Sequence, residues 1–297
     1  EFRRVLFRSK MKKYVRMLRV KHWLKNVLIF APLFFGEVLF NYTMIAKSFY
    51  AFLAFGLAAS VVYIINDIND VEKDRKHPTK CKRPIASGEV SIKAAWVFCA
   101  MLVLLVAVMS FAAVFLDLYS YVAVIWLVAY IVINLIYSKW GKHVPVVDVV
   151  LLAVGFLIRL YYGAQVVQVD ISAWLYLTVL AGAFYLGMGK RRNELKNVSE
   201  GETRAVLRKY NYAFLDKNMY VCIAFAEVTY ALWAMQSEHS GLMFTVPVVM
   251  VIFMKYSLNI EADDSEGNPM DVLLEDKLLL VCVLLYAIIA FFSIYVL

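Results

Sequence analysis

Charged side chains are scarce in this chain. Asp, Glu, Lys and Arg make up 18% of its 297 residues, whereas hydrophobic residues make up 63% and the mean hydropathy is +0.69. A soluble domain is usually about 45–50% apolar, so this composition excludes an ordinary soluble protein and predicts an integral membrane protein. The net charge of +8 therefore does not indicate a nucleic-acid partner, because basic residues of membrane proteins gather on one side of the bilayer.

Cysteines are few, and no signal peptide is evident. Cys81, Cys99, Cys222 and Cys282 are scattered and form no Cys-x-x-Cys pair, which excludes a disulfide framework. The first ten residues, EFRRVLFRSK, lack a small-residue cleavage site and are not typical of a signal peptide. Two alternatives stay open for residues 1–10, a non-native extension ahead of a start at Met11 or native sequence. Residues 11–297 are expected to form a single transmembrane domain.

Strict alternation of polar and apolar residues, which marks the strands of a membrane barrel, is also absent. The apolar residues form long blocks instead, and only helices satisfy the backbone of such blocks in lipid. About 20 mostly apolar residues span a bilayer, so the sequence predicts an all-α bundle of nine transmembrane helices. They cover roughly 26–42, 47–66, 93–116, 119–137, 146–165, 173–189, 219–237, 242–259 and 278–297.

The basic residues divide unevenly between the two sides of this predicted bundle. Of the 31 Lys and Arg, 29 fall in the N-terminal segment and in the loops on its side. Lys47 lies on the other side and Arg159 lies inside the fifth predicted span. The positive-inside rule makes the basic side cytoplasmic. We therefore expect a cytoplasmic N-terminus, an outside C-terminus and a functional site at the cytoplasmic face.

Acidic and amide side chains gather where the second predicted span ends, in NDINDVEKD at residues 66–74. Asp67, Asp70 and Asp74 are spaced by three and four residues, so they share one helix face, with Asn66 one turn from Asp70. Carboxylates this close repel one another unless a cation joins them. Oxygen ligands suit Mg²⁺, which commonly binds one or two carboxylates plus substrate phosphates. The alternative is an ordinary charged inner loop that only marks topology.

Cations follow the acidic motif and recur in two later inner loops. Pro78 ends the helix, and a basic loop comes next. The second segment, 137-YSKWGKHVPVVD-148, carries Lys142 and Asp148. The third, 189-GKRRNELKN-197, carries Lys190, Arg191 and Glu194. These residues either mark topology and form an ion pair on the helix surface, or they include cations that bind phosphate. Arg159, buried in lipid at a cost, suits either an ion pair with Glu227 or a lipid pocket.

With these motifs in view, the sequence resembles the UbiA superfamily of membrane prenyltransferases. The resemblance rests on NDxxDxxxD at 66–74, on HPxKxxRPIASG at 77–88 and on the Tyr137–Lys142–Asp148 block, and it covers essentially the whole chain after Met11. It implies an all-helical bundle with a central cavity open to the cytoplasmic face. It also implies that Asn66, Asp67, Asp70 and Asp74 hold Mg²⁺ bound to a diphosphate substrate.

A second Asp-rich motif, which typical aromatic prenyltransferases carry after the sixth span, is missing. KRRNE stands there, at 190–194. Together with RVKHWLKN at 19–26 and NPMDVLLEDKLL at 268–279, this basic segment resembles the decaprenyl-phosphate phosphoribosyltransferase branch. That branch uses phosphoribosyl pyrophosphate as donor and a polyprenyl phosphate as acceptor. It implies a transferase of a bacterial or archaeal cell membrane with a role in cell wall biosynthesis.

A binding site for phosphoribosyl pyrophosphate needs a metal ion for the diphosphate and cationic side chains for the 5-phosphate. The acceptor adds a further phosphate that the site must bind. The predicted catalytic residues are Asp67, Asp70, Asp74 and Arg83; the predicted phosphate-binding residues are Lys80, Arg83, Lys142, Lys190 and Arg191, and Tyr137, Asp148 and Glu194 complete the polar site. Two other functions stay open: a UbiA-type aromatic prenyltransferase, and a transporter or lipid-binding protein without chemistry. A transporter is typically built from inverted repeats and broken helices, which the sequence does not show.

Overall fold

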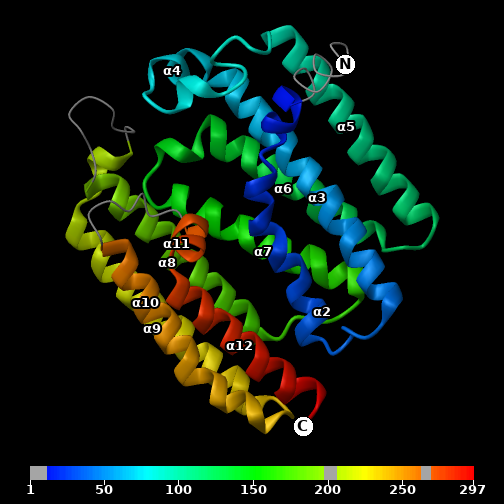
Figure 1. The fold of residues 1–297 in the computed structure, drawn as a ribbon, viewed down its shortest axis with the longest axis vertical. Helices are drawn as coiled ribbons and strands as arrows, with labels where there is room; N and C mark the ends of the chain where they lie inside the picture. The colour runs from blue at the N-terminus through cyan, green and yellow to red at the C-terminus, as the bar shows by residue number, and fades with distance from the viewer. Residues whose placement is uncertain (1–11, 197–205, 262–268) are drawn as a thin grey trace. The chain divides into compact units, whose positions relative to one another are not determined.

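The protein is helical throughout the part that the structure describes. This computed structural model describes residues 12–196, 206–261 and 269–297, and these ranges contain no β-strand (Figure 1). The predicted extension at residues 1–10 lies outside them. Within them, seven helices are long and apolar enough to cross a membrane. These are α3 (Tyr42–Asn69), α5 (Ile92–Phe115), α6 (Tyr121–Lys139), α7 (Val147–Val167), α9 (Tyr212–Gln236), α10 (Thr245–Glu261) and α12 (Lys277–Tyr295).

The seven helices match seven of the nine predicted spans. The eighth match is α8 (Ala173–Lys196), which coincides with the sixth predicted span but carries the charged KRRNE segment in its last turns and is not among the seven. Side chains on α5 and α6 lie largely at the surface; Phe111, for example, is 72% exposed. Because soluble monomers rarely expose such continuous apolar faces, these surfaces indicate contact with lipid.

The first predicted span, 26–42, is not one continuous α-helix. The chain forms a 3₁₀-helix, η1 (Val20–Phe30), then the short α2 (Ala31–Phe35). Glu37 then has a left-handed backbone with φ 60°. Pro32, which has no N–H to donate to a helical hydrogen bond, lies in this segment, and Gly36 and Glu37 follow α2. An 11-residue 3₁₀-helix is unusually long, since such helices rarely exceed three or four residues.

Close packing holds η1 in place. The Trp23 indole N–H donates to Ser60 Oγ at 3.1 Å, and the Trp23 ring covers Gly56 of α3. On α7, Gly163 lies directly against the Ile29 backbone. Buried Arg159 donates to Asn26 Oδ1 at 2.8 Å and to the Tyr130 hydroxyl at 3.1 Å. The contacts of Arg159 thus tie η1 to α6 and α7.

The close approach at Gly163 gives a stability prediction. A Cβ there would lie 2.9 Å from the Ile29 carbonyl carbon and closer still to its oxygen, so Gly163→Ala should destabilise the protein by about 1–3 kcal/mol. Gly182 of α8 is the matched control, because a Cβ there meets nothing within 4 Å. Gly182→Ala should be neutral or stabilising by up to about 1 kcal/mol. Thermal unfolding in one detergent compares the two; equal shifts would contradict the packing argument.

The chain divides into two compact units. Of the described residues, unit 1 contains 12–33, Val38–Ser138 and Arg159–Val169. Unit 2 contains Phe34–Glu37, Lys139–Ile158 and the described residues from Asp170 to Leu297. In unit 1, α3 packs against η1 and α5, with a buried core that includes Ile64, Ile68 and Ile85. Asp67 lies on α3, Asp74 on α4 (Val71–Lys76) and Arg83 in the loop that follows, next to residues of this core.

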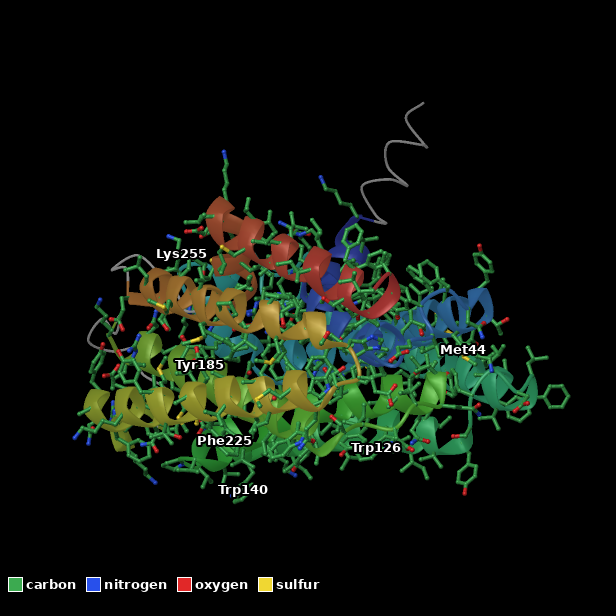
Figure 2. The ribbon with its side chains drawn as sticks, turned by 90° about the horizontal axis from the view of Figure 1, so that it is seen from below. Met44, Trp126, Trp140, Tyr185, Phe225 and Lys255 are labelled. Carbon is green, nitrogen blue, oxygen red and sulfur yellow. The ribbon has the colours of Figure 1, made fainter. Side chains whose placement is uncertain are left out.

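In unit 2, α8 packs along α9, and α10 packs against α9 and α12 (Figure 1). Tyr185 of α8 lies inside this bundle (Figure 2), where its hydroxyl hydrogen-bonds to Ser257 of α10 and its ring centroid is 5.7 Å from that of Tyr256. Buried side chains therefore fix α8 against α10, and α8 carries the KRRNE segment at its end.

Candidate functional site

The acidic motif lies where α3 ends. α3 stops at Asn69, Asp70 follows with φ −96° and ψ 10°, and α4 (Val71–Lys76) begins. The helical hydrogen bonds continue across the break, because the Asp70 N–H donates to the Asn66 carbonyl at 2.9 Å and the Asp74 N–H donates to the Asp70 carbonyl at 2.8 Å. The expected single helix is thus interrupted at Asp70, yet Asp67 and Asp74 still face the same side.

An arginine joins these two carboxylates. Arg83 Nη1 donates to Asp67 Oδ1 at 3.0 Å and to Asp74 Oδ2 at 2.5 Å. Asp67 is 5% exposed and Asp74 is 4% exposed, so both charges are largely removed from water and depend on this guanidinium. The sequence predicted that neighbouring carboxylates require a cation; in the structure Arg83, from the basic loop, is one such cation.

Arg19 is a second cation on Asp67, and sequence reasoning assigned it no role. Its side chain forms an ion pair with Asp67 and lies over the Tyr63 ring, 5.5 Å from the centroid. Arg19 precedes η1 with a left-handed backbone, φ 52° and ψ 47°. The available signal was its position as the first residue of RVKHWLKN. We call Arg19, Asp67, Asp74 and Arg83 the arginine–aspartate cluster.

The oxygen atoms of this region fit a hard divalent cation. Asn66 Oδ1 is buried and accepts no hydrogen bond within the described residues, and such an orphaned acceptor is typical of a missing ligand or ion. Asn66 and the aspartates offer only oxygen ligands, as Mg²⁺ prefers. In the described ranges no three His, Cys, Asp or Glu side chains converge as a metal-binding group. A metal would therefore draw on Asn66 and on substrate oxygens as well as on carboxylates.

A second buried cluster forms in unit 2. Arg191 Nε donates to Asp148 Oδ2 at 2.6 Å, and Arg191 Nη1 donates to Glu194 Oε2 at 2.6 Å. Asp148 is fully buried and Arg191 is 1% exposed, whereas the Glu194 side chain is 21% exposed. Glu194 is therefore the partner of Arg191 that solvent reaches. We call Asp148, Arg191, Glu194 and Tyr210 the Asp148 cluster.

Tyr210 completes this cluster from a segment that sequence reasoning left without a function. Its hydroxyl donates to Asp148 Oδ1 at 2.6 Å and accepts from the Val146 N–H at 2.5 Å. Burial, together with the hydrogen bond to Asp148, raises the pKa of Tyr210 well above its ordinary value. Tyr210 thus remains a donor to Asp148 over the whole neutral range. α7 begins at Val147, two residues after Pro145 and one residue after the start of the predicted span 146–165.

Removal of the Tyr210 hydroxyl should weaken the fold measurably. Tyr210→Phe leaves the fully buried Asp148 carboxylate short of one donor, at a cost of about 1–3 kcal/mol. Tyr212→Phe is the control, since its hydroxyl makes a 3.4 Å contact with Glu261 at the surface and should be nearly neutral. Thermal unfolding in detergent compares the variants, and an equally small effect of both would contradict a structural role for Tyr210.

The remaining predicted site residues lie in or beside these segments and are half-buried. Lys80 is in η2 (Lys80–Lys82), Tyr137 is near the end of α6, Lys142 is in η3 (Gly141–His143) and Lys190 precedes Arg191 on α8. The structure brings together Asp67, Asp74 and Arg83 in unit 1, and Asp148, Arg191 and Glu194 in unit 2.

Comparison with known proteins identifies the family. The family model described as the UbiA prenyltransferase family matches residues 29–200. The chain belongs to this family. It is 32% identical over 292 residues to a decaprenyl-phosphate phosphoribosyltransferase of Corynebacterium glutamicum, covering 95% of this chain and 86% of that protein. It is 33% identical over 276 residues to the Mycobacterium tuberculosis protein of the same name, covering 89% and 88% of the two chains.

Solved structures of UbiA proteins share the fold. A UbiA homolog from Archaeoglobus fulgidus bound to GPP and Mg²⁺ superposes with a TM-score of 0.72 over 96% of this chain and 100% of that one, at 20% sequence identity. This level of identity supports the architecture alone. The family model begins at residue 29 and ends at residue 200, so it includes the acidic motif, Asp148 and Arg191, but neither Arg19 nor Tyr210.

Proposed function

We propose that this UbiA-family protein transfers the 5-phosphoribosyl group of phosphoribosyl pyrophosphate to a polyprenyl phosphate such as decaprenyl phosphate and releases pyrophosphate. The observation that carries the proposal is the similarity to two proteins named decaprenyl-phosphate phosphoribosyltransferase, at 32% and 33% identity over about nine-tenths of each chain. The segment KRRNE is consistent with this function, because it supplies cations where an aromatic prenyltransferase would carry a second Asp cluster.

The proposed cofactor is Mg²⁺, held by Asn66, Asp67, Asp70 and Asp74 together with the donor diphosphate. The orphaned Asn66 oxygen supports this assignment, as does Mg²⁺ in the related A. fulgidus structure. When bound, Mg²⁺ would neutralise charge on the pyrophosphate leaving group as a Lewis acid.

The protein's own side chains then position the two substrates and stabilise the negative charge of their phosphates. We propose that Arg83, already between two carboxylates, turns one face of its guanidinium to a phosphate oxygen of the donor, with Lys80 beside it in the loop. The bond between C1 of ribose and the pyrophosphate oxygen breaks, and an oxygen of the acceptor phosphate bonds to C1 from the opposite face. That acceptor oxygen is already anionic at neutral pH, so no general base is required. Catalysis rests on orientation and electrostatics.

In unit 2 we propose that a phosphate of the donor or acceptor takes the place of Glu194 on Arg191. Glu194 is the partner that solvent reaches, whereas Asp148, which also accepts from the Tyr210 hydroxyl, accepts from Nε on the other side of the guanidinium. Arg191 can then bind an anion without moving from its buried position. Lys142 and Lys190 would add further positive charge for the phosphates, and Tyr137 would complete the polar lining.

The proposal includes an orientation. Together with the seven long apolar helices, the segment of η1 and α2 would form one further span and helix α8 another. This would give the nine predicted spans. The basic segments that carry Lys80, Lys142 and Arg191 would lie at the cytoplasmic face, with the N-terminus inside and the C-terminus outside. A central cavity would open to that face, and the polyprenyl tail would leave it sideways into lipid. Its setting would be a bacterial or archaeal cell membrane, in cell wall biosynthesis.

A reconstitution assay tests the function. Purified protein in detergent with Mg²⁺, phosphoribosyl pyrophosphate and decaprenyl phosphate should release pyrophosphate and form a phosphoribosyl lipid, identified by mass spectrometry. Omission of Mg²⁺, or addition of a chelator, should stop both. A parallel reaction offers a polyprenyl diphosphate and 4-hydroxybenzoate. Prenylation of the aromatic acid without phosphoribosyl transfer would instead assign the protein to the aromatic prenyltransferases.

A further inference from the structure

A pocket of about 200 Å³ lies at one end of unit 2. Its walls come from the start of α8, the end of α9, the η5 segment (Ser240–Phe244), the end of α12, the last residue of α2 and Glu37 just after it. Trp174 of this pocket is in the first turn of α8 and Arg191 is in its last turns, so about 25 Å of helix separates them. The pocket therefore lies at the opposite end of α8 from the Asp148 cluster.

Aromatic rings form much of the pocket wall. Phe35 and Trp233 pack edge to face with centroids 5.2 Å apart, and Trp174 lies on the wall with them. Two uncharged polar groups are already engaged: the Trp174 indole N–H donates to Gln236, and Ser237 Oγ accepts from the His239 N–H. The faces of the aromatic rings attract cations.

The carboxyl group of the pocket lining is that of Glu37. Its side chain is 57% exposed, and Oε1 accepts from His239 Nε2 at 2.8 Å. Within the described part of the chain, no other side-chain hydrogen bond forms to Glu37. Its backbone has φ 60°, a conformation that non-glycine residues adopt only where the surroundings hold them, often at ligand sites.

Apart from His239, the titratable side chains at this end of the unit are acidic. The stretches 34–37, 170–172 and 237–244 contain the carboxylates of Glu37, Asp170 and Glu238 and no Lys or Arg. The titratable partner that faces Glu37 is His239. An anionic ligand would be repelled by this field, and a cation would be drawn to it.

We propose that this pocket binds a primary ammonium group, with the Glu37 carboxylate as its counter-ion and the rings of Trp174, Trp233 and Phe35 around it. The ends of membrane-spanning helices lie at the level of lipid headgroups. The ammonium would therefore come from the ethanolamine headgroup of a phospholipid or from a free amine in solution, and both present the same –NH₃⁺ to the carboxylate.

Native mass spectrometry of the full-length protein in detergent tests the proposal. With phosphatidylethanolamine added, the wild type should retain a lipid adduct, whereas phosphatidylglycerol with the same chains should bind at least about tenfold more weakly. Glu37→Gln removes the charge at nearly constant shape and should weaken the phosphatidylethanolamine adduct about tenfold, since a charge-assisted hydrogen bond is lost. Glu238→Gln, which removes the same charge from the neighbouring loop outside the pocket, should change it less than twofold.

A competition with free ethanolamine and the variant His239→Gln complete the test. Free ethanolamine that displaces the lipid, or binds when the lipid does not, supports an ammonium site and distinguishes the two sources. His239→Gln keeps the carboxylate and should retain the adduct. Phosphoribosyl transfer should be unchanged in Glu37→Gln, which shows that the variant is folded. Equal binding of both lipids, or an unchanged adduct in Glu37→Gln, would overturn the proposal.

Discussion

Asp67→Asn should lower phosphoribosyl transfer at least about a thousandfold, which corresponds to about 4 kcal/mol of transition-state stabilisation. Asp67 is the common acceptor of Arg19 and Arg83 and a proposed ligand of Mg²⁺. The amide keeps the shape but removes the charge, so it weakens metal binding and releases both arginines from their shared partner. Steady-state rates of pyrophosphate release over a range of Mg²⁺ concentrations measure the effect.

The control for this prediction is Glu72→Gln on α4. The Glu72 side chain is 75% exposed and pairs with Arg75 one turn away, an interaction of less than about 1 kcal/mol. Transfer by Glu72→Gln should stay within about twofold of wild type. Asp67→Asn should also require more Mg²⁺ for half-maximal rate, which a purely structural defect would not produce. Near-normal activity of Asp67→Asn at low Mg²⁺ would eliminate the metal role.

The long helices were predictable, and the N-terminal segment was not. α7 was expected at 146–165 and runs over Val147–Val167, because a run of apolar residues determines a membrane helix by itself. η1 depends instead on distant residues: Gly56 and Gly163 leave room for Trp23 and for the Ile29 backbone. Hydropathy carries no information about such close approaches, so residues 26–42 were predicted as one continuous span.

In the candidate site, too, partners within one motif were predictable and partners far apart in the chain were not. Asp67 and Arg83 are 16 residues apart in the chain, and their common motif pointed to both. Arg19 reaches Asp67 from 48 residues away, and Tyr210 reaches Asp148 from 62 residues away. From a single sequence, such distant partners can be identified only where they belong to a recognised motif. Arg19 begins RVKHWLKN, so its position but not its function was visible, whereas no motif pointed to Tyr210.

Arg191→Ala should both destabilise the protein and abolish transfer. It leaves the fully buried Asp148 without its cation, and loss of one partner of a buried pair costs about 3–5 kcal/mol. Arg75→Ala is the control, since Arg75 belongs to an exposed pair that contributes less than about 1 kcal/mol. Thermal unfolding in detergent should separate the two variants clearly. Arg191→Lys keeps the charge but not the planar fork that serves two carboxylates, so it should fold and transfer about 10–100-fold more slowly.

A double-variant cycle distinguishes the buried pair from two independent residues. Asp148→Asn combined with Arg191→Ala should cost less than the sum of the single changes, by about 0.5–3 kcal/mol, because the second change removes a charge that the first left unpaired. Arg191→Asp rebuilds one acid of the missing second motif but places it beside Asp148 and Glu194. Like charges repel in a buried site, so this variant should lose phosphoribosyl transfer and gain no prenyl transfer. Strict additivity in the cycle would contradict a coupled Asp148–Arg191 pair and would show that Asp148 is stabilised chiefly by Tyr210 and the α7 N-terminus.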